Sequence, residues 1–121
     1  MSKKIMIVED NDANMSYFNS LLQAHGYTTM QARDGHNVLP SVKADRPDLI
    51  LMDIQLPGLS GLEVTQSLKA DEDLRDIPVV AVTAFALKGD EEKILRAGCA
   101  SYVTKPIAVA ALLDVVKEYA A

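Results

Sequence analysis

Carboxylate, hydroxyl and amine side chains follow four short apolar runs of this chain. Glu9 and Asp10 come after the first run, Asp53 after the second, Thr83 after the third and Lys105 after the fourth. Short apolar runs with helical segments between them are typical of parallel β-strands. Ligands of open parallel sheets bind beyond the carboxyl ends of the strands. We therefore expect these side chains to converge on one edge of a sheet.

The three acids indicate a divalent metal site. Carboxylates packed together repel one another, and a hard cation such as Mg²⁺ relieves that repulsion while leaving room for a phosphate oxygen. A single acid at a strand end is more often a solvated loop residue. A pair, Glu9 and Asp10, with Asp53 at a neighbouring strand end favours Mg²⁺ binding.

Asp53 follows an unbroken apolar run, which predicts a place at the base of the cleft. A carboxylate there can act as a nucleophile and form an acyl phosphate. Phosphoryl transfer then needs positioning and charge neutralisation, which the Lys105 ammonium and the Thr83 hydroxyl can supply. Each alone has a simpler interpretation, a surface lysine and a strand threonine, but their joint placement favours the site. The Lys105–Pro106 bond is trans by default, and a cis bond would aim the lysine into the site.

Length and charge restrict the class of protein. The chain has 121 residues, 49% of them hydrophobic, which suits one domain with a sizeable core and no output domain. A net charge of −5 argues against nucleic acid as the main partner. The longest apolar stretch, 107–113, is far too short to insert into a membrane, and Cys99 is the only cysteine. We expect a cytoplasmic protein.

Apolar periodicity predicts five strands alternating with five helices, hence an α/β fold with helices on both faces of a parallel sheet. The predicted strands cover residues 4–9, 28–32, 49–53, 79–83 and 101–104. Helices are predicted from a cap at Asn11 or Asp12 to Gly26, over residues 36–44, 62–70 and 90–97, and along an apolar stripe from Val109 to Val116. Pro40 disrupts the second helix, which is either kinked or begins later than His36.

Five segments resemble the response-regulator receiver domain, the flavodoxin-like module of two-component signalling, and the resemblance covers the whole chain. These segments are Val8–Asn11, Asp48–Asp53, Pro57–Gly61, Val82–Ala84 and Tyr102–Pro106. The resemblance implies one receiver domain over residues 1–121. It also implies a (βα)5 three-layer sandwich whose five-stranded parallel sheet has the order 2-1-3-4-5.

The resemblance also assigns roles in phosphoryl transfer. Asp53 would accept a phosphoryl group from a histidine kinase or a phosphotransfer protein. Asp10 and Asp53, with the backbone carbonyl of Gln55, would hold Mg²⁺, and Glu9 would act through water. The protein would promote only its own phosphorylation and dephosphorylation, so it would be a phosphoacceptor rather than an enzyme that releases a metabolite.

Thr83 and Tyr102 would form the switch pair of the family, and Ala84 would leave space for the phosphoryl group. Phosphorylated Asp53 would attract the Thr83 hydroxyl, which opens space for Tyr102 to turn inward. The face of the fourth helix, fifth strand and fifth helix would then change shape. Partners would bind this face and the first helix, with the unphosphorylated protein a monomer. Taken alone, Tyr102 is simply a half-buried strand aromatic.

Residues near the helical part of that face would include Lys88, Glu92 and Arg96. Gln55 and Phe85, each two residues beyond a site residue, would flank the phosphoryl group. Gln55 could hydrogen-bond a phosphoryl oxygen or a water. Our hypothesis is that Phe85 shields the acyl phosphate from hydrolysis, and the alternative is a loop hydrophobe that packs on the following helix.

A narrower resemblance concerns the stand-alone receivers of alphaproteobacterial cell-division control. It lies in the tracts 52–57, 77–86 and 88–91. It implies that the partners are histidine kinases governing cell division and polarity.

Two other functions use similar residues. A Mg²⁺-dependent phosphohydrolase would carry a second aspartate where this chain has Gln55. A pseudo-receiver would have lost an acid, the threonine or the lysine, whereas all five site residues are present here. No glycine-rich loop follows the first strand, so dinucleotide binding has no support.

Overall fold

The computed structural model describes residues 3–84 and 88–120, which form alternating strands and helices, as predicted. The strands are β1 (Lys4–Val8), β2 (Thr28–Ala32), β3 (Leu49–Asp53), β4 (Val79–Thr83) and β5 (Ser101–Thr104). The helices are α1 (Asp12–Ala24), α2 (Val38–Ala44), α3 (Gly61–Ala70), α4 (Lys88–Arg96) and α5 (Val109–Tyr119). None of these helices in the described ranges is long and apolar enough to cross a membrane.

The strands of the described residues form one parallel, five-stranded sheet in the order β2-β1-β3-β4-β5. The register pairs Val8 of β1 with Met52 of β3, and Asp53 of β3 with Val82 of β4. The carboxyl ends of these three central strands therefore lie level with one another. This topology is the flavodoxin-like fold, and it confirms the predicted α/β class and strand order.

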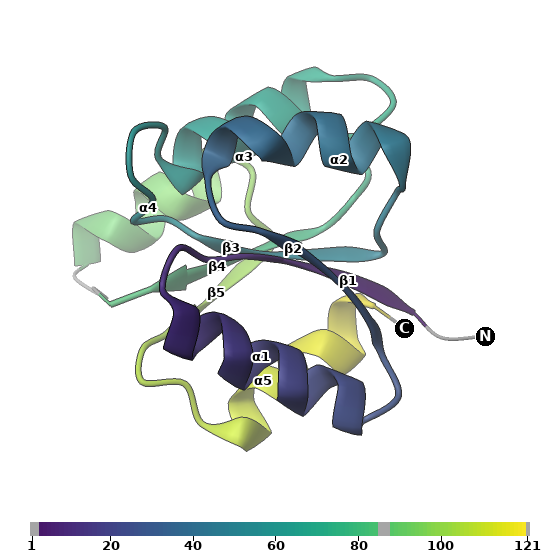
Figure 1. Ribbon diagram of the computed structural model, residues 1–121. Coiled ribbons are helices and arrows are strands. Elements are labelled where there is room, and N and C mark those ends of the chain that lie inside the picture. The colour runs from purple at the N-terminus through teal and green to yellow at the C-terminus, as the bar shows by residue number, and fades with distance from the viewer. Residues whose placement is uncertain (1–2, 85–87, 121) are drawn as a thin grey trace.

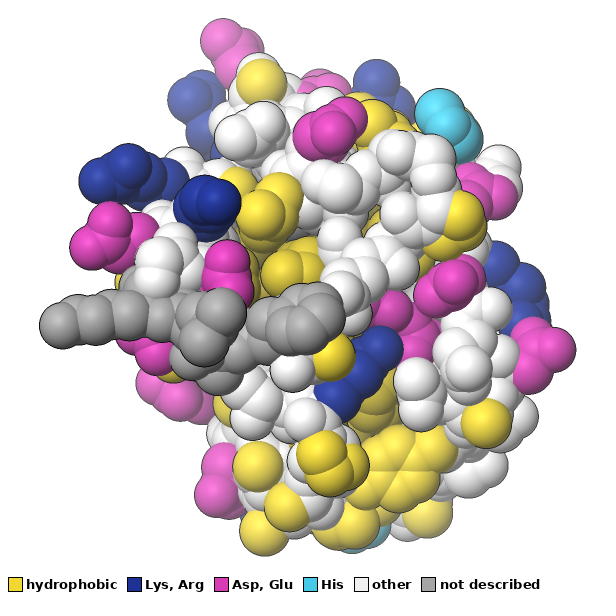
Figure 2. All heavy atoms as spheres, turned by 90° about the vertical axis from the view of Figure 1, so that its left-hand side faces the viewer, with side chains coloured by type: hydrophobic (Ala, Val, Ile, Leu, Met, Phe, Trp, Pro, Cys, Tyr) yellow, Lys and Arg dark blue, Asp and Glu magenta, His cyan; other side chains and the backbone are white. Residues whose placement is uncertain are grey.

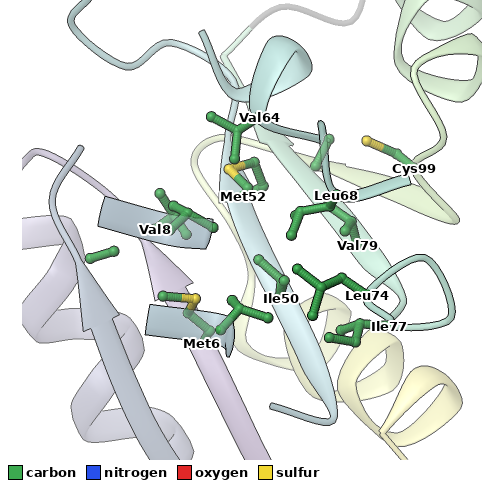
Figure 3. Packing of buried hydrophobic residues seen from close by; sticks show 14 of the residues in the cluster. Met6, Val8, Ile50, Met52, Val64, Leu68, Leu74, Ile77, Val79 and Cys99 are labelled. Atoms are coloured by element: carbon green, nitrogen blue, oxygen red, sulfur yellow. The ribbon is translucent and has the colours of Figure 1, made fainter. Parts of the chain in front are cut away.

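Helices cover both faces of the sheet, with α2, α3 and α4 on one face and α1 and α5 on the other (Figure 1). Because side chains alternate along a strand, β1 and β3 contribute residues to both cores, and every residue of the two strands except the half-buried Lys4 is buried. Figure 3 shows the first core, where residues of β1 and β3 pack against α3: Met6, Val8, Ile50, Met52, Val64 and Leu68. The second core contains Ile5, Ile7, Met15, Phe18, Leu22, Leu112 and Val116.

The second helix begins later than His36, which resolves the ambiguity that Pro40 created. A 3₁₀ turn, η1 (Gly35–Asn37), precedes α2, and the Asp34 side chain caps it by accepting the Asn37 N–H at 3.1 Å. Pro40 then falls in the first turn of α2, where backbone N–H groups have no intrahelical acceptor. The proline therefore costs the helix no hydrogen bond.

A close backbone approach places the start of α3 against the end of β3. A Cβ at Gly61 would lie 2.3 Å from the carbonyl oxygen of Asp53, so a larger residue would force the two elements apart. The Gly61 N–H donates to the Ile54 carbonyl at 3.2 Å. The loop between β3 and α3 is thereby held beside Asp53.

Candidate functional site

Two buried acids and one lysine meet at the carboxyl edge of the sheet. Glu9 follows β1, Asp53 ends β3 and Lys105 follows β5. The Lys105 ammonium lies 3.1 Å from a carboxylate oxygen of Glu9 and 3.1 Å from one of Asp53. The acid side chains are 1% and 3% exposed and the lysine side chain 23%. The arrangement can hold a negative charge on Asp53 with a cation directly beside it.

The backbone brings Lys105 into this position. Its N–H donates to the Thr83 carbonyl at 2.7 Å, which extends the ladder between β4 and β5 by one residue. The Lys105–Pro106 peptide bond is cis rather than the default trans. The tertiary amide of an X-Pro bond makes this form accessible, because it narrows the preference for trans.

Asp53 is held in its ionised form. Burial raises its pKa, but hydrogen bonds from Glu9, from the Gln55 N–H and from Lys105 outweigh burial and lower the pKa below its usual value. The Gln55 N–H donates to Oδ1 at 2.9 Å, while Lys105 contacts Oδ2. A carboxylate that stays ionised can act as a nucleophile.

The pKa of Glu9 is shifted in the opposite direction. Burial, the hydrogen bond with Asp53 and the Asp53 charge raise its pKa to about 7, although hydrogen bonds with Asn14 and Lys105 counteract part of this shift. Its Oε2 atom is buried and has no hydrogen-bond partner among the described residues. A buried carboxylate oxygen without a partner is costly, so this atom suits a cation or a water.

The acids can supply the oxygen donors that Mg²⁺ prefers. Glu9, Asp10 and Asp53 each offer a carboxylate oxygen, and these oxygens lie within 4.8 Å of one another. Asp10 is exposed, so the cluster is open to solvent on one side. The oxygen-only donor set, together with the partnerless Glu9 oxygen, fits a hard divalent cation.

The start of α1 is fixed directly after these acids. The Asn11 side chain accepts the Asn14 N–H at 3.0 Å and caps the helix. The Asn14 side chain lowers the pKa of Glu9 and lines a cavity of about 550 Å³ beside Lys105. Sequence reasoning missed this role of Asn14. Its position three residues after the cap, in the turn nearest the strand end, is the signal that could have indicated it.

The cavity beside Lys105 is largely apolar. Its other walls come from Tyr17 and Phe18 of α1 and from Pro106 and Ile107 after β5. The Tyr17 hydroxyl donates to the Ile107 carbonyl at 3.0 Å and so joins α1 to the loop that carries Lys105. Figure 2 looks onto this edge, where acidic and basic side chains meet near the centre above a hydrophobic area on the side of α1 and α5.

The two residues expected to form the switch, Thr83 and Tyr102, lie on the neighbouring strands β4 and β5. Thr83 is buried at the end of β4, next to the end of β3, and Ala84 after it is exposed. Tyr102 is half-buried on the α4 side of β5, and its hydroxyl donates to Glu91. This hydrogen bond is the largest cause that raises the pKa of Tyr102, and burial and the Glu91 charge raise it further. Phe85 lies outside the described residues.

The α4 acid that contacts Tyr102 is not the one that sequence reasoning placed near this face. Glu91 accepts the tyrosine hydroxyl, whereas Glu92 lies 3.7 Å from Arg96 in an exposed pair along the helix. Successive residues of an α-helix point about 100° apart, so adjacent acids can face different surroundings.

Known proteins share this sequence and fold. The response regulator receiver domain family matches residues 5–117. The chain is 56% identical over 119 residues to the polar-differentiation response regulator DivK of Brucella anthropi, a match that covers 98% of this chain and 97% of that protein.

Two solved structures bear on the site. One is the receiver domain of a sensor histidine kinase from Pseudomonas aeruginosa PAO1, with a magnesium ion coordinated in its active site cleft. It is 36% identical, with a TM-score of 0.90, and the match covers 98% of each chain. The other is a Saccharomyces cerevisiae receiver domain in complex with a histidine phosphotransfer signalling protein, 31% identical with a TM-score of 0.91, covering 98% of this chain and 89% of that one.

These matches extend over nearly the whole chain and agree with the strand order and with the acids at the sheet edge. They also confirm the narrower resemblance, because the relative is the polar-differentiation response regulator DivK. The chain therefore belongs to the response regulator receiver domain family and is a DivK-like response regulator.

Proposed function

We propose that this receiver takes a phosphoryl group on Asp53 from a phosphohistidine of a histidine kinase or phosphotransfer protein. The observation that carries the proposal is the placement of Asp53. Its carboxylate is buried, kept ionised by a lowered pKa, and paired with Lys105 at 3.1 Å. A nucleophile of this kind needs little besides positioning and charge neutralisation for phosphoryl transfer.

In the reaction, a carboxylate oxygen of Asp53 forms a bond to phosphorus. The bond between phosphorus and the histidine nitrogen breaks, and its electron pair returns to the imidazole. The Lys105 ammonium, on a flexible stem, can follow the new negative charge from Asp53 onto a phosphoryl oxygen. The Gln55 N–H keeps the other carboxylate oxygen in place through the 2.9 Å hydrogen bond.

Mg²⁺ would be held by Asp10, Asp53 and the backbone carbonyl of Gln55, with Glu9 acting through water. When bound, the ion would neutralise charge on the phosphoryl oxygens. The fit rests on the three clustered carboxylates and on the buried Glu9 oxygen that has no partner among the described residues. A magnesium ion is coordinated in the active site cleft of the related kinase receiver, which supports Mg²⁺ as the ion.

The phosphoryl group would be read out by Thr83 and Tyr102. In this proposal the Thr83 hydroxyl moves toward phosphorylated Asp53, Ala84 leaves the space, and Tyr102 turns inward. Gln55 and Phe85 would flank the group and govern its hydrolysis. The resulting change in the α4–β5–α5 face would be the signal that partners detect.

The partners would be kinases or phosphotransfer proteins that bind α1 and the α4–β5–α5 face. The apolar cavity between α1 and the loop after β5 lies beside Lys105 and offers a docking place next to the nucleophile. A related receiver forms a complex with a phosphotransfer protein. By analogy with the DivK relatives, we propose that this receiver is cytoplasmic, is monomeric before phosphorylation and takes part in the control of cell division.

The test is phosphorylation by a small acyl phosphate. The protein is incubated with acetyl phosphate with and without Mg²⁺, and its intact mass is measured together with released phosphate. We expect one added phosphoryl group on the wild type, dependent on Mg²⁺, and none on Asp53→Ala. Asp48→Ala is the matched control, because Asp48 is an exposed acid just before the opposite end of β3.

Two outcomes would contradict the proposal. An adduct that persists in Asp53→Ala would place the acceptor elsewhere. The absence of both adduct and released phosphate in the wild type would indicate a pseudo-receiver that acts without phosphorylation. Sustained turnover of unrelated phosphate esters would instead favour the phosphohydrolase.

A further inference from the structure

We propose that Glu91 is a positioning residue that holds Tyr102 in the half-buried position it has in this structure, which we call outward. Its consequence for signalling rests on the proposed function, because it matters only if Asp53 is phosphorylated and Tyr102 moves. The carboxylate of Glu91 accepts the hydrogen bond of the Tyr102 hydroxyl and so links the first turn of α4 to the edge strand β5.

The surroundings of Glu91 favour this hydrogen bond. Glu91 is half-buried, and among the described side chains it takes part in no salt bridge. Its neighbour Glu92 is 71% exposed at the side chain and pairs with Arg96. Two adjacent acids on one helix therefore have different partners, and Glu91 is the one turned toward β5.

The position of Tyr102 on an edge strand leaves its side chain room to move. Tyr102 lies on β5, which pairs only with β4 in the described sheet, so one side of this strand has no neighbouring strand. Its side chain packs against the edge of the core that contains Ile94 of α4. The ring is thus supported from one side, while the hydroxyl is held at its far end by Glu91.

The hydrogen bond acts on one conformation only. When Tyr102 turns inward, its hydroxyl must leave Glu91, so the contact stabilises the outward state and not the inward one. A contact made in one state alone shifts the equilibrium between the two by its full free energy.

The experiment observes Tyr102 directly in the unphosphorylated protein. Tyrosine is replaced by fluorotyrosine, ¹⁹F NMR spectra are recorded, and Tyr102→Phe assigns the signal of Tyr102. The other tyrosines, at positions 17, 27 and 119, serve as internal references. The variants are Glu91→Ala, which removes the acceptor, and Glu91→Gln, which keeps an acceptor oxygen without the charge. Glu92→Ala is the matched control.

We expect Glu91→Ala to shift the Tyr102 signal toward its position in the phosphorylated wild type. The loss of one hydrogen bond of ordinary net strength at a half-buried site corresponds to an inward population raised by about three- to tenfold. Glu91→Gln should shift the signal less, and Glu92→Ala should leave it in place. Helix content by circular dichroism should be the same in all variants.

A Tyr102 signal in Glu91→Ala that coincides with the wild-type signal would overturn the proposal. So would an equal shift in Glu92→Ala, since that would make the effect one of charge on α4 in general. Mass measurement of Asp53 phosphorylation in the same samples separates this proposal from the previous one. A shifted signal without phosphorylation supports the Glu91 contact and contradicts the phosphoacceptor role. Phosphorylation without a shift supports the phosphoacceptor role and contradicts the Glu91 contact.

Discussion

The acid cluster and the edge strand β5 are built in opposite ways. Glu9 and Asp53 lie at the ends of central strands that are buried and paired on both sides, so their positions are determined by the core. Tyr102 lies on a strand paired on one side, and Val103 is the only buried residue of that strand. Groups that must be held in place for chemistry belong on the first kind of strand, and a group that must move belongs on the second.

Lys105 joins the two regions. It follows the edge strand, yet its ammonium contacts both central acids at 3.1 Å. A change at the acids is therefore transmitted to the end of β5 through an ion pair. This is the physical reason to expect that phosphorylation of Asp53 alters the surface that β5 helps to form.

Replacing Lys105 with methionine should have the largest effect, because it removes the cation while retaining a long side chain. We expect phosphorylation of Asp53 by acetyl phosphate to slow by about a hundredfold or more, as for the loss of one charge-stabilising donor in an active site. The rate is measured by intact mass over time. Lys93→Met, on an exposed position of α4, is the control. An unchanged rate in Lys105→Met would mean that the cluster does not need its link to β5.

Glu9→Gln should show how the ionisation of Glu9 changes the stability of the folded protein. Glu9 has a pKa of about 7 in the fold against 4.5 ordinarily, so the folded state holds the proton more tightly. Without metal, wild-type stability should therefore fall as pH rises from 4.5 through 7. Glutamine does not ionise, so the free energy of unfolding of the variant should exceed that of the wild type by about 3 kcal/mol at pH 8, and the two should be similar at pH 4.

Urea unfolding at a series of pH values measures this effect. Glu118→Gln, at an exposed site on α5, should follow the wild type at every pH. Added Mg²⁺ should raise the stability of the wild type more than that of Glu9→Gln, because an ion bound only to the folded state stabilises it. Parallel pH profiles of the wild type and Glu9→Gln would contradict the burial of an ionisable Glu9.

Val82→Ala and Val103→Ala compare a central strand with the edge strand directly. The two valines are register partners on β4 and β5 and pack in the same core, with exposures of 1% and 8%. We expect a loss of about 2 kcal/mol for Val82→Ala from two buried methyl groups and the cavity they leave. The loss for Val103→Ala should be about 1 kcal/mol, since the edge can relax. Equal losses would show that β5 is as rigid as β4.

Tyr102→Phe should have the smallest effect. The substitution keeps the ring and removes only the hydroxyl that Glu91 accepts. We expect the free energy of unfolding to change by less than about 1 kcal/mol, and Asp53 phosphorylation to keep its yield. Both are checked by urea unfolding and intact mass. A loss of phosphorylation here would mean that Tyr102 belongs to the chemical site and not to the readout.

The boundaries of most elements follow from local pattern. Apolar runs such as Val79–Thr83 and glycine stops such as Gly26 and Gly98 predict the strands and helix ends to within a few residues. The start of α2 does not follow, because Pro40 is compatible with a kink or with a later start. The structure has the later start, with a separate turn capped by Asp34. The isomer of the Lys105–Pro106 bond is also undetermined locally, since the two forms differ by only about 1 kcal/mol.

The amino-acid sequence by itself determined which chemical groups stand at the ends of the strands. Residue type and the period of two along a strand are local properties, so Glu9, Asp53 and Lys105 could be assigned to one sheet edge from the pattern alone. The sheet order then followed from the receiver resemblance.

Only the tertiary structure decided how these groups differ from one another. It buries Glu9 beside Asp53, which raises the pKa of one and leaves the other ionised, while Asp10 stays exposed. It also turns Glu91 rather than Glu92 toward Tyr102, because the rotation of α4 is determined by the burial of Ile94 against the sheet. Burial and helix rotation depend on contacts between residues far apart in the chain, and a local pattern does not contain them.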